Sequence, residues 1–220
     1  FQLKKGDVMA VPIGLNSVTF GLGWDSRCDV DSSCVGLDAE SKEVFRVYFG
    51  NKTYSDVVRH SGDNLTGEGS GDDEQIVVDL GRMPPHVVSI YFVVNVFTSG
   101  KDFSDVDGEY CRLVDSGIHG NGREIMRFKS MDSGKFNGIV MIAVNRSNIC
   151  GGDQWMFEAV SYPAMGRTVA DLVDECQMLQ KQHFSKLKGR TAQRPIVIDH
   201  HDLIKRTHVF SFLLFPPPPP

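Results

Sequence analysis

The acidic, glycine-rich run from residue 60 to residue 75 constrains this chain more than any other segment. Asp and Glu alternate there with Gly, no Lys or Arg interrupts the run, and the apolar segment 76–78 follows directly. Carboxylates crowded this closely repel one another unless a cation lies among them. The glycines let the backbone double back, so that carbonyl oxygens can join the carboxylates around one centre. Such a centre suits a hard cation, and Ca²⁺ suits it better than Mg²⁺ because its coordination is more flexible.

A solvated acidic loop is the alternative interpretation of this run, since Gly/Asp loops are common as turns. Two familiar loops are excluded. An EF-hand starting at Asp63 would place Leu65 at its third position and Glu68 where glycine is required. A P-loop would need Gly-Lys-Ser/Thr, and the carboxylates of this run would repel phosphate.

Another acidic cluster lies upstream and contains Asp25, Asp29 and Asp31. Because it comes earlier in the chain, it is called the first acidic cluster, and the run 60–75 is called the second acidic segment. On a strand, Asp29 and Asp31 lie two residues apart on the same face, so both carboxylates can point at one ion. Asp-x-Asp alone is a weak signal. Two acidic clusters that converge at one end of a fold predict a metal site more specifically.

Composition limits the partners and the compartment. The chain of 220 residues has a net charge of −5 and a pI of about 5.8, which excludes nucleic acid as an expected partner. Its longest apolar stretch, 87–97, is too short to span a bilayer, and no signal peptide is visible at the start. The five cysteines form no C-x-x-C pair, so we expect free thiols and a cytoplasmic protein.

Short apolar runs rich in Val, Ile, Phe and Tyr recur along the chain, punctuated by Gly, Asn, Asp or Pro. Each has the length of a strand. The runs are 18–24, 44–49, 76–80, 87–97, 110–114, 138–144 and 155–160. Helical spacing appears only over 169–179, where Thr168 and Asp171 form a capping arrangement. The pattern predicts an all-β protein, an antiparallel β-sandwich with a short C-terminal helix and an irregular tail.

The tail differs from the rest of the chain. From about Gln182 the strand rhythm stops, basic residues gather, and the chain ends in five prolines. We therefore expect a β-sandwich domain over 1–181 and a basic, proline-ended tail of low order over 182–220.

Several of these segments also resemble the TerD family of tellurium-resistance and stress proteins. The motifs that carry the resemblance are 21–25, 29–33, 48–51 and 62–74. The last of them matches almost without departure. The likeness runs from Lys5 to the helix near Gln180 and leaves out the tail. It implies a β-sandwich that binds calcium through acidic loops, acts in stress response and has no catalytic activity.

The resemblance also implies a set of calcium ligands drawn from both acidic segments. Most would bind through carboxylates, whereas Leu65 and Gly67 would offer backbone carbonyls and Asp25 could instead orient a ligand. The implied residues are Asp25, Asp29, Asp31, Asp63, Asn64, Leu65, Gly67, Glu68, Asp72, Asp73 and Glu74. One departure stands out: Arg27 occupies a position where family members commonly carry Asp, which should weaken one calcium position or reduce the number of ions.

Two functions from different classes follow. The first is a non-catalytic calcium-binding stress module that acts through protein partners, whose identity the sequence does not reveal. The second is a calcium-dependent docking module that works in the manner of C2 domains. A membrane is the less expected target, because the main acidic loop offers Leu65 as its one apolar side chain. A hydrolase is not expected, since His60, Ser61 and Asp63 are near neighbours that cannot converge on an extended chain and no Gly-x-Ser-x-Gly elbow occurs.

Overall fold

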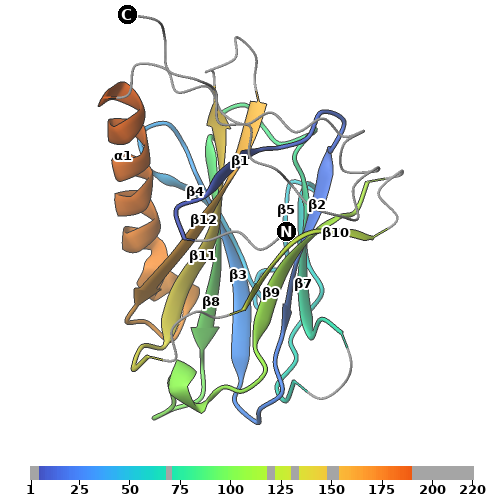
Figure 1. The fold of residues 1–220 in the computed structure, drawn as a ribbon, viewed down its shortest axis with the longest axis vertical. Helices are drawn as coiled ribbons and strands as arrows, with labels where there is room; N and C mark the ends of the chain where they lie inside the picture. Colours follow the sequence, from blue (N-terminus) through green and yellow to red (C-terminus); the bar gives the residue numbers. More distant parts are fainter. Residues whose placement is uncertain (1–4, 68–70, 118–121, 130–133, 148–153, 190–220) are drawn as a thin grey trace, which may run out of the picture.

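Two antiparallel six-stranded sheets pack face to face in the computed structural model, and a helix covers the outer face of one of them (Figure 1). The structure describes residues 5–67, 71–117, 122–129, 134–147 and 154–189. The all-β sandwich with a C-terminal helix that the sequence predicts is thereby confirmed.

The sheet next to the helix, here called sheet A, has the strand order β1-β12-β11-β8-β3-β4. Its strands are β1 (Val8–Ala10), β3 (Val30–Leu37), β4 (Glu43–Val47), β8 (Ser89–Val96), β11 (Gly138–Ser147) and β12 (Gln154–Ala164). The opposite sheet, sheet B, has the order β10-β9-β2-β7-β6-β5. Its strands are β2 (Ser17–Gly23), β5 (Thr53–Tyr54), β6 (Val58–His60), β7 (Glu74–Asp79), β9 (Tyr110–Asp115) and β10 (Arg123–Lys129).

Strand β8 in the middle of sheet A is buried on both faces, and this explains its unbroken apolar run. Alternate residues of a strand point to opposite faces. Phe92 belongs to the main core between the sheets, where its ring stacks on Phe20 of β2 at a centroid distance of 4.7 Å. Its neighbours Tyr91 and Val93 belong to a second core on the helix side. A strand buried on both faces must be apolar at nearly every position.

The C-terminal helix begins where the capping arrangement predicts a helical start. Asp171 accepts hydrogen bonds from the Thr168 amide (3.0 Å) and the Thr168 hydroxyl (2.9 Å), which caps the 3₁₀ helix η2 (Val169–Leu172). The helix α1 (Val173–Gly189) follows directly. A further 3₁₀ turn, η1 (Phe103–Asp105), lies between β8 and β9.

Helix α1 runs on to Gly189, so the domain boundary predicted at residue 181 falls inside the helix. The predicted tail beyond residue 189 lies outside the described residues. Three polar contacts, made by two side chains, hold the later part of the helix against sheet A. The Gln180 amide donates to the Asp38 carbonyl (3.0 Å) and the Ser89 hydroxyl (2.9 Å), and His183 Nδ1 lies 2.8 Å from Glu158 Oε2.

We predict that a chain cut after residue 189 unfolds at the same temperature as the full chain, because it keeps every contact described above. A chain cut after residue 181 loses the His183–Glu158 bond and should lose about 1.5–3 kcal/mol of stability, the usual contribution of a hydrogen bond to a charged group. Thermal unfolding of both truncations measures this. His183→Ala in the full chain is the matched control and should reproduce the loss.

Candidate metal centre

The site is built on an open edge of strand β3. The neighbouring strand β4 pairs with β3 only from Cys34 to Leu37. The Ser32 backbone therefore meets side chains of sheet B on this edge. Its amide donates to Glu74 Oε2 (2.7 Å), and its carbonyl oxygen lies 3.1 Å from His60 Nε2. Glu74 and His60 thus satisfy the peptide groups that a neighbouring strand would otherwise satisfy.

Glu74 and His60 are buried inside the sandwich, with Glu74 fully inaccessible to solvent. The Ser32 hydroxyl also donates to Glu74 Oε2 (2.8 Å). His60 Nδ1 accepts a hydrogen bond from the Gly62 amide (3.0 Å), which assigns the ring proton to Nε2. In a Ser-His-acid triad the serine and the acid bind opposite ring nitrogens. Here the Ser32 hydroxyl and the Glu74 carboxylate both lie next to His60 Nε2, and Ser32 is fully buried. These three residues therefore do not have the geometry of a catalytic triad.

Asn64 and Asp73 shape the acidic loop above this edge. The Asn64 side chain donates to Asp73 Oδ1 (3.1 Å) and accepts from the amides of Thr66 and Gly67 (3.2 Å each). Asp73 Oδ2 accepts from the Trp24 amide (3.0 Å). These bonds fold the loop onto the segment that carries the first acidic cluster, so the two acidic segments of the sequence do converge.

Trp24 closes the space beneath the loop. Its indole nitrogen donates to the Cys28 carbonyl (3.0 Å), and the ring packs against Gly67. Gly67 has φ 58°, and a Cβ there would overlap the indole. Glycine is therefore required at this position for both conformation and space.

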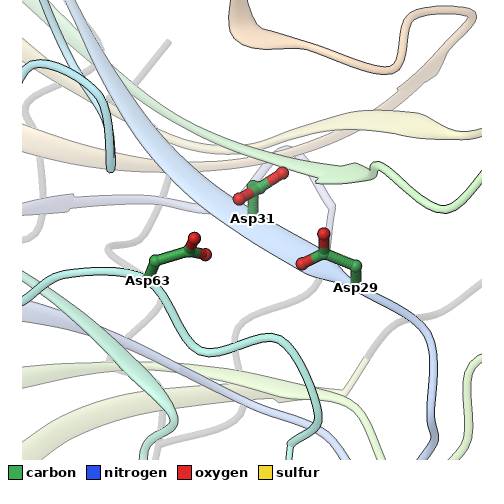
Figure 2. Close-up of side chains that lie close together, drawn as sticks. All are labelled: Asp29, Asp31 and Asp63. Atoms are coloured by element: carbon green, nitrogen blue, oxygen red, sulfur yellow. The ribbon is translucent and has the colours of Figure 1, made fainter.

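Three carboxylates lie close together beside strand β3. Asp29 directly precedes β3, Asp31 lies on β3, and Asp63 comes from the loop that follows β6 (Figure 2). One oxygen of each lies within 4.8 Å of the others. The prediction that Asp29 and Asp31 lie close enough to face one ion agrees with this geometry, and Asp63 joins them from the second acidic segment.

The electrostatics of the cluster favour a cation. Burial and the charges of Glu74, Asp29 and Asp63 raise the pKa of Asp31 to about 8. Burial also raises the pKa of Asp29, with Asp63 and Glu74 adding to the effect. The charged groups that act on both residues are all carboxylates. A cation between them would relieve this repulsion.

The raised pKa has a consequence for stability. Between pH 4 and 8 the folded protein holds a proton on Asp31 that the unfolded chain, in which this side chain has its ordinary pKa of 3.8, has released. Stability falls with pH wherever the folded state binds more protons than the unfolded state. In the absence of a cation, this residue therefore stabilises the fold below about pH 4, and that contribution is lost as the pH rises through about 8.

The cluster also fits calcium in its dimensions. Oxygens that bind one Ca²⁺ at about 2.4 Å lie no more than about 5 Å apart, and the carboxylate oxygens already meet that limit. Asp29 Oδ1 is buried and has no hydrogen-bond partner. A buried carboxylate oxygen is costly unless a donor or a cation faces it.

The remaining predicted ligands that the structure describes are not part of the three-carboxylate cluster. Leu65 is 59% exposed, and the Asp25 side chain is exposed beyond Trp24. Glu68 lies outside the described residues. Asp72 forms a bidentate ion pair with Arg112 of β9, at 2.6 and 3.0 Å, and is not one of the three carboxylates of the cluster.

Two contributors to the site were not predicted from the sequence. The sequence suggests His60 only as a catalytic base. The one signal for its contact with the Ser32 backbone is its position two residues before Gly62, from whose amide it accepts a hydrogen bond. Arg112 lies far along the chain, and nothing in its surroundings indicates a contact with the acidic loop.

Fold and site together define a helix-backed β-sandwich with a carboxylate cluster at a sheet edge. The sequence profile described as the TerD domain matches residues 1–175, so the chain belongs to the TerD family. It is 37% identical to the tellurium resistance protein TerZ of Serratia marcescens over 174 residues, covering 72% of this chain and 86% of that protein. It is 30% identical to the stress response protein SCP2 of Bacillus subtilis, covering 78% and 96%.

Solved structures agree on the fold. A crystal structure of a homologue of the telluride resistance protein TerD from Streptomyces coelicolor superposes with a TM-score of 0.64 at 18% identity, covering 74% of this chain and 98% of that one. The profile match and these relatives together place the chain in a family of tellurium-resistance and stress-response proteins. Within the described residues, no helix is long and apolar enough to cross a membrane.

We predict that Glu74→Gln lowers the pKa of Asp31 towards its ordinary value. The amide still offers an oxygen to Ser32, but the substitution removes the charge that acts most strongly on Asp31 after burial itself. NMR titration of the Asp31 carboxyl carbon measures the change. Asp79→Asn, at the opposite end of β7, is the control and should leave this pKa where it is. An unaltered Asp31 pKa in Glu74→Gln would show that burial alone sets it.

Proposed function

We propose that this protein is a non-catalytic stress-response module that binds calcium through Asp29, Asp31 and Asp63. The observation that carries the proposal is the meeting of three carboxylates from two segments within 4.8 Å, with one buried oxygen of Asp29 lacking a partner. Oxygen donors without nitrogen or sulfur suit a hard cation. Ca²⁺ is favoured over Mg²⁺, which retains its waters and demands a stricter octahedron.

Bound calcium would neutralise the cluster and link the loop after β6 to β3. Asp29 and Asp31 belong to the sheet A side of the site, whereas Asp63 belongs to a loop between two strands of sheet B. An ion held by all three would therefore join the two sheets at this end of the sandwich. Glu74 would remain behind them, bound to Ser32, and add negative charge without needing to reach the ion.

The physiological role proposed here follows the relatives. Those from Serratia and Bacillus are described as tellurium resistance and stress response proteins, and we propose the same kind of role for this chain. We further propose that it acts in the cytoplasm through protein partners. Its described cysteines Cys28, Cys34, Cys111 and Cys176 are free and buried, which suits a reducing compartment.

We predict that Asp63→Asn weakens calcium binding at least tenfold, about 1.4 kcal/mol. Asp63 is exposed, so the substitution removes one charged ligand with little change in folding. Isothermal titration with CaCl₂ measures the affinity. Asp56→Asn is the matched control, because it removes the same charge from an exposed turn with φ 53°, a conformation that Asn tolerates well. Equal affinities for the two variants would contradict the assignment of Asp63.

We predict that calcium affinity rises with pH up to about pH 8 and that binding below this pH releases protons. The ion binds the ionised carboxylate, whereas Asp31 with a pKa of about 8 is mostly protonated at pH 7 in the calcium-free protein. Titration in buffers of different ionisation enthalpy counts the protons released. Affinity that stays constant from pH 6 to 8 would show that Asp31 does not bind the ion.

A further inference from the structure

Asp72, Asp73 and Glu74 are consecutive acids, yet their side chains point to different places. Residues two apart on a regular strand share a face. Glu74 instead points into the sandwich towards Ser32, whereas Asp72 lies on the outer face of sheet B, beside Gly21. Gly21 is an outward position, because Phe20 and Leu22 on either side of it belong to the core. The chain therefore enters β7 through an irregular turn, in which Gly71 has φ 118°.

The Asp72 carboxylate accepts several hydrogen bonds on that outer face. Oδ1 accepts from Arg112 Nε (2.6 Å) and from the Tyr110 hydroxyl (3.2 Å). Oδ2 accepts from Arg112 Nη2 (3.0 Å) and from Gln75 Nε2 (3.0 Å). The side chain of Asp72 is 1% exposed. The Tyr110 hydroxyl has a single proton, which the nearby Gly71 carbonyl also accepts, so three N–H donors hold the Asp72 carboxylate on this face and the tyrosine adds a shared contact.

Two glycines of β2 make room for this contact. The Asp72–Arg112 pair crosses β2 at Gly21, and the Tyr110 ring crosses it at Gly23. A Cβ at either position would overlap the group above it. Arg127 of β10 stacks over the same Tyr110 ring at 4.2 Å from its centroid. The pair thus ties the end of the acidic loop across β2 to β9.

A short chain of contacts leads from this pair to the carboxylate cluster. Asp73, next to Asp72, donates its amide to the Leu22 carbonyl (2.8 Å) and accepts from the Asn64 side chain. The Asn64 amide lies 3.4 Å from Glu74 Oε1, and Asn64 directly follows Asp63. Any change in how the chain passes from Asp72 to Glu74 would therefore move Asp63.

We propose that the Asp72–Arg112 pair is a positioning clasp that sets the calcium affinity of the site from the opposite face of sheet B. This rests on the proposed calcium binding and adds two residues to it that touch no ion. The clasp fixes the irregular entry into β7, and that entry holds Asp63 and Glu74 against β3.

The direction in which one substitution changes the calcium affinity tests the clasp. Arg112→Ala removes a positive charge, so electrostatics alone would tighten calcium binding. The clasp predicts the opposite, an affinity loss of about tenfold, as is typical when a residue that orients a metal ligand is removed. Titration of Ca²⁺ into the full-length protein measures it. Arg59→Ala, an exposed arginine on β6 of the same sheet, is the matched control and should not weaken binding.

Three further variants complete the experiment. Asp72→Asn should weaken binding as Arg112→Ala does, and the double variant should be no weaker than either alone, because the two residues act as one unit. Gly21→Ala should weaken binding without changing any charge, since its Cβ displaces the Asp72 carboxylate. Arg112→Lys keeps the cation but not the bidentate geometry, and should recover only part of the affinity.

The outcomes separate the clasp from the calcium site. Tighter binding in Arg112→Ala together with weaker binding in Asp72→Asn would make Asp72 a ligand and overturn the clasp. Unchanged affinity in Arg112→Ala and Gly21→Ala would also overturn it, with calcium binding itself intact. A parent protein that takes up no calcium would instead overturn the proposed function. Thermal unfolding identifies a variant that has lost its fold, in which case Arg112→Lys decides.

Discussion

The hydrogen bond from the Ser32 amide to the buried carboxylate of Glu74 is the contact on which the rest of the site depends. It closes the edge of β3 where β4 ends, and it joins sheet A to sheet B. An edge left open inside the protein would carry unsatisfied peptide groups. Closing it with an acid rather than an amide places a negative charge beside Asp31, and this charge adds to burial, the larger cause, in raising the pKa of Asp31.

The acidic loop therefore combines structural and binding duties in neighbouring residues. Glu74 supports β3, Asp73 orders the loop through Trp24 and Asn64, and Asp72 anchors it to Arg112. Among the described residues of the loop, Asp63 is the acid that faces the first acidic cluster. Most of the acids in this motif thus hold the backbone in place, and few remain free for an ion.

Much of the fold could be predicted from the sequence, because local patterns of apolar and turn residues specify strands. The runs that form β2, β7, β8, β11 and β12 are each visible in the sequence. Strand β3 is not, since Asp31, Ser32 and Ser33 give it a polar character although all are buried. The sequence predicts helix α1 too short, because the contacts of Gln180 and His183 with sheet A, rather than apolar spacing, hold its later turns.

By itself, the sequence determined that two acidic segments exist, that glycines let them turn, and that Asp29 and Asp31 share a face wherever their segment is extended. These follow from residue type and from the two-residue period of a strand. Which acids face one another was decided only by the tertiary structure. The partners of Asp72 and Glu74 lie on strands far away in the chain, and an irregular turn sends these two side chains to opposite faces of sheet B. No local pattern encodes these contacts, because Ser32 reaches Glu74 only when the two sheets have packed, and Arg112 reaches Asp72 only when β9 and β7 have both paired with β2.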